Sequence, residues 1–119
     1  MRILLFGSIE DYTCVLNCQD LVCDLQYRRI KCCHAPDFDS FLDQLRGDSY
    51  DIIVVSAGGA EGMEGVIAAQ KLVPNGDIVW LSDDPGFGIQ AHRLGCTYFG
   101  VKPITEELIA KAYRAYHQV

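Results

Sequence analysis

The chain has 119 residues, of which 50% are hydrophobic, and a formal net charge of −6. This length suits one domain with a single core and excludes two ordinary domains. The negative charge argues against a nucleic-acid-binding surface, and no stretch approaches the roughly 20 apolar residues that span a bilayer. The apolar run at 3–6 is too short for a signal peptide and lacks a clear cleavage site. We therefore expect one globular, cytoplasmic domain over residues 1–119.

The first half of the chain alternates between apolar runs and helical patterns. We predict a strand over residues 2–6, a helix from about residue 10 to 25, a short polar edge strand over 27–33, and a helix over 36–47. In that last helix the apolar residues repeat with helical spacing and the acidic ones face water. The apolar set is Phe38, Phe41, Leu42 and Leu45, and the acidic set is Asp37, Asp39 and Asp43.

The middle of the chain, DIIVVSAGG at residues 51–59, carries the most buried strand. Its apolar residues 52–55 do not alternate with polar ones, which is typical of a strand covered on both faces. A glycine-rich loop is expected over 57–65, where glycine permits unusual backbone angles. A helix follows over 66–73 and ends at the turn sequence Pro74-Asn75-Gly76.

The last third repeats the same alternation. We predict a buried strand over 77–82, a short irregular helix over 85–94, a strand over 97–101, and a final helix from Thr105, which caps an acidic first turn. The inner side of the final helix would carry Ile104, Leu108, Ile109, Ala112 and Tyr116.

Five strands that alternate with five helices predict a parallel sheet with helices on both faces. The length favours an open, flavodoxin-like, three-layer α/β fold with strand order 2-1-3-4-5 rather than a barrel. In such sheets ligands gather at the carboxyl ends of the strands, where Ser56 follows the central strand.

The chain resembles a response-regulator receiver domain (CheY-like) over its whole length, most specifically in AHRLGCTYFGVKPI at residues 91–104. The resemblance implies that Lys102 is the receiver lysine that pairs with the phosphoryl group, joined to Pro103 by a cis peptide bond. Ser82 matches the hydroxyl that reaches the phosphate. Phe99 matches the aromatic residue that turns inward on activation.

Three positions depart from that pattern. Receivers carry two acids for Mg²⁺ after the first strand, where this chain has Gly7 and Ser8, and Ser56 stands at the phospho-acceptor aspartate. Phosphoryl transfer needs a carboxylate nucleophile and a divalent ion, whereas a serine hydroxyl needs a base. We therefore expect a degenerate receiver that is not phosphorylated on aspartate, is not an enzyme, and uses no cofactor or metal. The other nearby acids are expected to be helix caps: Glu10, Asp11, Asp83 and Asp84.

The vacated pocket should contain Ser8, Ser56, Ser82 and Lys102. We expect Lys102 to lie along the surface with its stem packed, although an anion held against backbone N–H groups is the competing interpretation. The sequence leaves open whether Ser56 is a substrate of a serine kinase.

The favoured function is a signalling module that binds a protein partner or a second copy of itself, without direct contact to nucleic acid or membrane. In the receivers that it resembles, the face of the fourth helix, fifth strand and fifth helix docks partners. Aromatic residues are enriched at interface centres, and this region carries Tyr98, Phe99, Tyr113 and Tyr116.

Three alternatives remain. The emptied pocket could bind a small anion or nucleotide as a sensor, and displaced acids could support an active phospho-receiver. The six cysteines could make a thiol or zinc protein, although their spacing lacks the paired CxxC pattern and free, mostly buried thiols are expected. They are Cys14, Cys18, Cys23, Cys32, Cys33 and Cys96.

Overall fold

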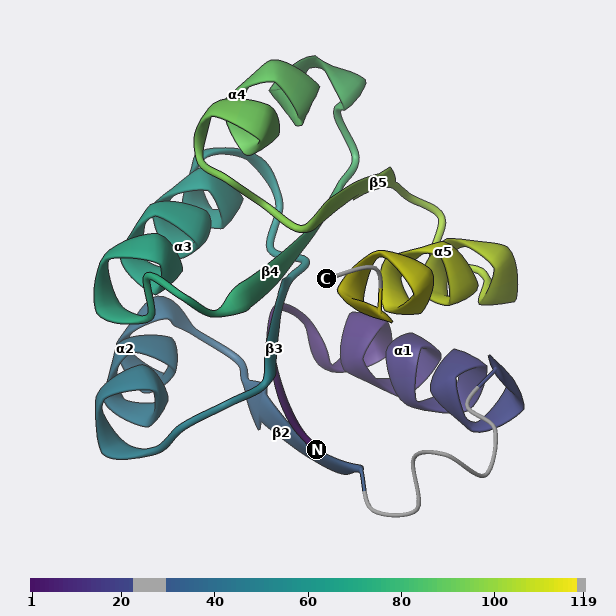
Figure 1. The fold of residues 1–119 in the computed structure, drawn as a ribbon, viewed down its shortest axis with the longest axis horizontal. Helices are drawn as coiled ribbons and strands as arrows, with labels where there is room; N and C mark the ends of the chain where they lie inside the picture. Colours follow the sequence, from purple (N-terminus) through teal and green to yellow (C-terminus); the bar gives the residue numbers. More distant parts are fainter. Residues whose placement is uncertain (23–29, 118–119) are drawn as a thin grey trace.

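The computed structural model describes residues 1–22 and 30–117, and within them one parallel sheet has the strand order β2-β1-β3-β4-β5 (Figure 1). The first half contains β1 (Arg2–Phe6), α1 (Ile9–Val22), β2 (Lys31–Ala35), α2 (Phe38–Gly47) and β3 (Ile52–Val55). The second half contains α3 (Gly59–Leu72), β4 (Asp77–Ser82), a 3₁₀ turn η1 (Pro85–Phe87), α4 (Gly88–Arg93), β5 (Tyr98–Val101) and α5 (Glu106–His117). The predicted flavodoxin-like fold and its strand order are confirmed.

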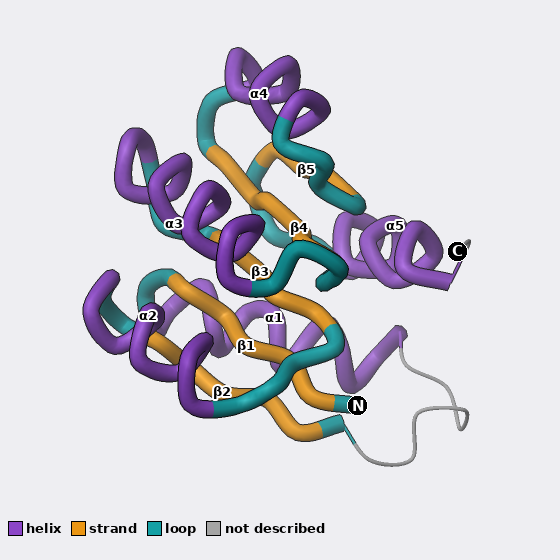
Figure 2. Tube along the Cα trace, turned by 60° about the vertical axis from the view of Figure 1, so that its left-hand side comes forward, coloured by secondary structure: helices purple, strands orange, loops and turns teal. Residues whose placement is uncertain are grey.

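Helices cover both faces of the sheet, and the alternation of side chains along each strand divides the core in two (Figures 1 and 2). In β1, Ile3 and Leu5 pack on the side of α1 and α5, whereas Leu4 and Phe6 pack on the side of α2, α3 and α4. All four side chains are buried. The apolar run of β1 is therefore packed against helices on both faces of the sheet, as its sequence predicts.

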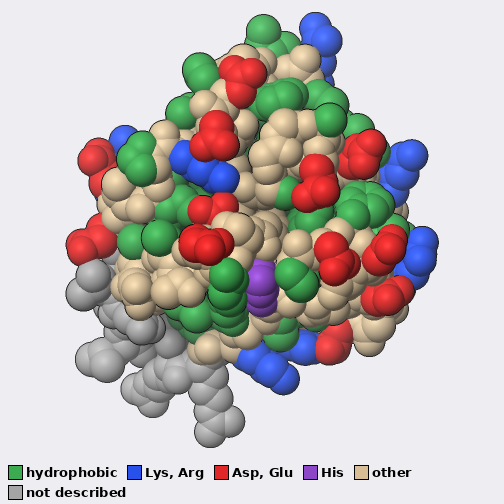
Figure 3. All heavy atoms as spheres, turned by 180° about the vertical axis from the view of Figure 1, so that it is seen from behind, with side chains coloured by type: hydrophobic (Ala, Val, Ile, Leu, Met, Phe, Trp, Pro, Cys, Tyr) green, Lys and Arg blue, Asp and Glu red, His purple; other side chains and the backbone are tan. Residues whose placement is uncertain are grey.

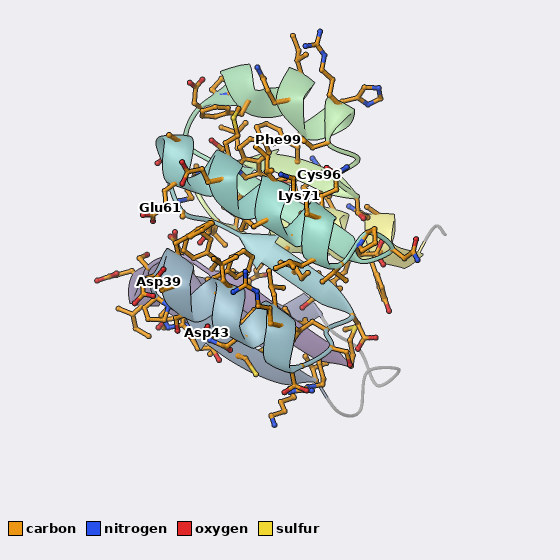
Figure 4. All side chains as sticks on the ribbon, turned by 90° about the vertical axis from the view of Figure 1, so that its left-hand side faces the viewer. Asp39, Asp43, Glu61, Lys71, Cys96 and Phe99 are labelled. Carbon is orange, nitrogen blue, oxygen red and sulfur yellow. The ribbon has the colours of Figure 1, made fainter. Side chains whose placement is uncertain are left out.

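Helix α2 follows the predicted pattern. Phe41 and Leu45 are buried, and the Asp37 side chain caps the helix by accepting a hydrogen bond from the Ser40 backbone N–H at 2.8 Å. Asp39 and Asp43 are exposed and project away from the sheet (Figure 4). The amphipathic spacing therefore placed this helix and its faces correctly.

The predicted glycine-rich loop over 57–65 is wrong, because α3 begins at Gly59 and includes Gly62 and Gly65. A Cβ at Gly62 would lie 2.2 Å from the Ala57 carbonyl oxygen, and one at Gly65 would lie 2.7 Å from the Phe6 ring. These two glycines therefore let the helix approach the sheet closely. Only Gly59, with φ +57°, needs the backbone freedom that we expected of the segment.

Strand β2 begins at Lys31 and ends at Ala35, later than the predicted 27–33, because His34 and Ala35 pair with Leu5 and Phe6 of β1. Its predicted position at the sheet edge is confirmed. Residues 27–29 of the predicted strand lie outside the described residues. The predicted end of the first helix, beyond residue 22, also lies outside them.

The cysteines that the structure describes are free, as expected, but they are not mostly buried. Cys14 is exposed on α1, and the other four are half-buried. Those four are Cys18, Cys32, Cys33 and Cys96. Two of them lie on the edge strand β2, which has a neighbour on one side alone. Cys23 lies outside the described residues.

None of the helices within the described ranges combines the length and apolar character that crossing a membrane requires.

Candidate functional site

The carboxyl ends of β1 and β3 meet at Gly7 and Ser56. Ser56 is 1% exposed, its backbone N–H donates to the Phe6 carbonyl at 2.8 Å, and its Oγ lies 3.5 Å from the same carbonyl oxygen. A Cβ at Gly7 would lie 2.0 Å from Ser56 Oγ. The Ser56 hydroxyl therefore fills the space beside Gly7 and is covered from solvent, so the folded chain does not present it to a serine kinase.

Lys102 points into this edge of the sheet, so the expected surface placement is wrong. Its Nζ donates to the Ser56 carbonyl at 2.7 Å and to Asp11 Oδ2 at 3.0 Å. Asp11, which we expected to act as a helix cap, instead supplies the carboxylate that Lys102 pairs with. The cap of α1 is Ser8, whose Oγ accepts from the Asp11 backbone N–H at 3.1 Å.

An open pocket of about 340 Å³ lies at this edge, a size at the lower end of small-ligand pockets. It is lined by Gly7, Ser8, Asp11, Pro36, Ser56, Ala57, Gly58, Glu61 and Lys102. Three of the four expected pocket residues are present. Ser82 is missing from the lining, because it is buried and its Oγ accepts from the Asp84 backbone N–H at 3.1 Å.

His34 of β2 borders the same edge. Its ring Nε2 lies 2.7 Å from the Gly7 carbonyl oxygen, and because a carbonyl only accepts, Nε2 carries the proton. The ring stacks on Tyr12 at 4.8 Å between centroids. In the sequence His34 lies two residues before Pro36, a position that does not distinguish it from a loop residue.

Phe99 belongs to an aromatic cluster between the sheet and the helices α3 and α4 (Figure 4). Its ring meets Trp80 edge-on at 5.7 Å, and Trp80 also contacts Phe87 at 5.2 Å. The Phe99 side chain is half-buried.

The three predicted interface tyrosines, Tyr98, Tyr113 and Tyr116, lie on the opposite side of the sheet from Phe99. Each is half-buried against the core under α1 and α5. The structure thus divides the predicted aromatic set between two layers. The large apolar side chains exposed around this region are different ones, Ile89 at 65% and Val101 at 41%.

Two of the described thiols, Cys18 and Cys96, lack the activation that nucleophilic catalysis uses. Burial raises the pKa of the Cys96 thiol to about 11, and burial is also the main cause that raises the pKa of Cys18. A reactive cysteine needs a lowered pKa. Across the described ranges, no three His, Cys, Asp or Glu side chains gather as a metal site would require.

No family model and no curated protein matches the sequence. Solved structures do match. The chemotaxis response regulator CheY4 of Vibrio cholerae is 20% identical with a TM-score of 0.75, and the match covers 97% of each chain. A response regulator of Thermotoga maritima is 15% identical with a TM-score of 0.78, over 99% of this chain and 98% of that one.

A response regulator of Burkholderia pseudomallei, solved with a phosphorylated aspartic acid and a calcium ion, is 18% identical with a TM-score of 0.69. That match covers 98% of this chain and 71% of that one. At such low identity the likeness concerns the fold, which here extends over nearly the whole chain. This chain therefore has the fold of a response-regulator receiver domain.

Proposed function

We propose that the chain is a receiver-fold signalling module that works without aspartyl phosphorylation and acts by docking a protein partner or a second copy of itself. The observation that carries this proposal is the content of the strand-end pocket. Gly7, Ser8 and Ser56 offer no carboxylate there, and Lys102 is already paired with Asp11. The two carboxylates of the lining, Asp11 and Glu61, belong to the first turns of α1 and α3. Neither follows a strand as an acceptor aspartate does, so the pocket has no carboxylate nucleophile at the strand end for phosphoryl transfer.

The electrostatics of the pocket count against the alternative of an anion or nucleotide sensor. Lys102 is the single cation of the lining, and both Asp11 and Glu61 face the same pocket. An incoming phosphate would have to displace Asp11 from Lys102 and approach two carboxylates. Acidic side chains are also spread across the face opposite to the view of Figure 1 (Figure 3), which disfavours nucleic acid on that surface.

The docking surface that we propose is the α4–β5–α5 face, which consists of the exposed Ile89 and Val101 together with the groove beside them. That groove is lined by Val101, Pro103, Thr105, Glu107, Leu108 and Lys111. β5 is an edge strand, so the backbone beside this groove has no strand neighbour on one side. Apolar side chains with a charged rim are the usual composition of a transient interface.

Beryllofluoride with Mg²⁺, which mimics a phosphoryl group on aspartate, tests the first half of the proposal. We expect amide NMR spectra of the labelled domain to stay unchanged at residues 7–8, 56, 82 and 99. Large shifts at those residues would show a working acceptor site and overturn the proposal.

Substitution on the α4–β5–α5 face tests the second half. We expect Val101→Glu to weaken self-association in sedimentation, or binding of a co-purified partner, at least tenfold. Leu72→Glu is the matched control, because Leu72 on α3 is 40% exposed and lies outside this face. Equal effects of the two substitutions would contradict the proposed docking face.

A further inference from the structure

The pairing of Lys102 connects parts of the fold that lie far apart in the sheet. Lys102 follows the edge strand β5, and its backbone N–H donates to the Ser82 carbonyl at the end of β4 at 2.9 Å. Its side chain then passes β4 to reach the Ser56 carbonyl after β3 and the Asp11 carboxylate in the first turn of α1. One side chain thus joins the edge of the sheet to its centre and to a helix on its face.

Solvent screens this ion pair only in part. The Lys102 and Asp11 side chains are 16% and 22% exposed, at a separation of 3.0 Å. The exposed pair Lys111–Glu107 on α5, by contrast, has side chains that are 50% and 77% exposed. Exposed pairs contribute little, whereas removal of one partner from a partly buried pair leaves a charge without compensation.

The segment held by this pair follows the strand that carries Phe99. Phe99 lies on β5 three residues before Lys102, and its ring rests on Trp80 of β4. Gly88 at the start of α4 lies beside the same ring, since a Cβ there would be 3.7 Å from it. The Phe99 ring therefore packs β5 against β4 and against the start of α4.

We propose that the Asp11–Lys102 ion pair is an intramolecular latch that holds β5 and the α4–β5–α5 face in one arrangement without any phosphoryl group. Asp11, supplied by α1 rather than by a strand end, gives Lys102 an internal anion. This inference rests on the proposed function only in naming the face that is held. The pair itself is tested without a partner and without beryllofluoride.

The test compares Asp11→Asn and Lys102→Met, which keep side-chain size while removing one charge each. Amide NMR spectra report on both ends of the proposed latch. We expect Asp11→Asn to shift the amides of residues 99–101, which are not its neighbours in sequence or across the sheet, as well as those near residues 11 and 56. The control is Glu107→Gln in the exposed α5 pair, and we expect its shifts to remain on α5.

A double-mutant cycle in urea unfolding measures the coupling of the two groups. We expect each single substitution to lower the equilibrium constant for folding about tenfold and the double substitution to add little. Additive effects, or Asp11→Asn shifts at 99–101 no larger than those of the control, would overturn the latch. If the Lys102→Met variant does not fold, the amide shifts of Asp11→Asn at residues 99–101, compared with those of the control, test the latch by themselves. A failed latch with no response to beryllofluoride would leave the proposed function standing.

Discussion

Gly62→Ala is the substitution that best separates the packing of α3 from helix propensity. Inside an exposed helix, alanine in place of glycine stabilises the fold by about 1 kcal/mol. At Gly62 the new Cβ would lie 2.2 Å from the carbonyl oxygen of Ala57 and 3.4 Å from Trp80 Nε1. The contact with a backbone atom leaves no side chain that can rotate away.

The size of the expected change in the free energy of unfolding follows from that geometry. Because Cβ atoms essentially never approach a neighbour closer than 3.0 Å, α3 or residue 57 would have to move by roughly 0.8 Å. Overpacking of this kind costs about 3 kcal/mol at the upper end of its range, and the gain in helix propensity offsets about 1 kcal/mol. We expect Gly62→Ala to lower the free energy of unfolding by about 2 kcal/mol.

Urea unfolding followed by Trp80 fluorescence measures the effect, because Trp80 is the only tryptophan and is 1% exposed. The control is Gly47→Ala at the exposed end of α2, where a Cβ would meet nothing within 4 Å. We expect that control to raise the free energy of unfolding by about 0.5 kcal/mol. If Gly62→Ala stabilised the protein as the control does, the close approach of α3 to the strand ends would be refuted.

Two further predictions concern ionisable groups. The Arg2 guanidinium hydrogen-bonds Asp48 through both carboxylate oxygens and lowers the pKa of that carboxyl, whose ordinary value is 3.8. This pair therefore stabilises the fold above that pH and loses its effect as the pH falls through the lowered pKa, so melting curves of wild type and Asp48→Asn should converge in acid. A difference in melting temperature between wild type and Asp48→Asn that stays constant as the pH falls would contradict this prediction. In native thiol labelling near pH 8, we expect the exposed Cys14 to react first and Cys96 far more slowly, since a pKa raised from 9.0 to about 11 lowers its thiolate fraction about 100-fold. Labelling of Cys96 as fast as Cys14, read by mass spectrometry, would show that burial does not protect it.

The architecture could be predicted because its signals are local. Uninterrupted apolar runs identify doubly covered strands, and the spacing of Phe38, Phe41 and Leu45 identifies the buried side of α2. The alternation of these elements then limits the topology to very few arrangements. Local signals also misled, since Gly62 and Gly65 look like loop residues until the sheet against which they pack is known.

The site was predictable only in outline. The ends of β1 and β3 lie at one edge of a parallel sheet, so the proximity of Gly7 and Ser56 follows from the fold class. The burial of Ser82 and the hydrogen bond from His34 to the Gly7 carbonyl depend on the directions of individual side chains. The spacing of residues in the sequence does not encode those directions.

By itself, the sequence determined the fold class, the strand order and the absence of carboxylates at positions 7, 8 and 56. The tertiary structure alone decided the partner of Lys102, because Asp11 lies 91 residues away in the chain. Two charges so distant meet only when the end of β5 and the first turn of α1 converge at one sheet edge. The sequence identifies Lys102 as a charged residue, but the packing of β5 and α1 determines which group that charge contacts.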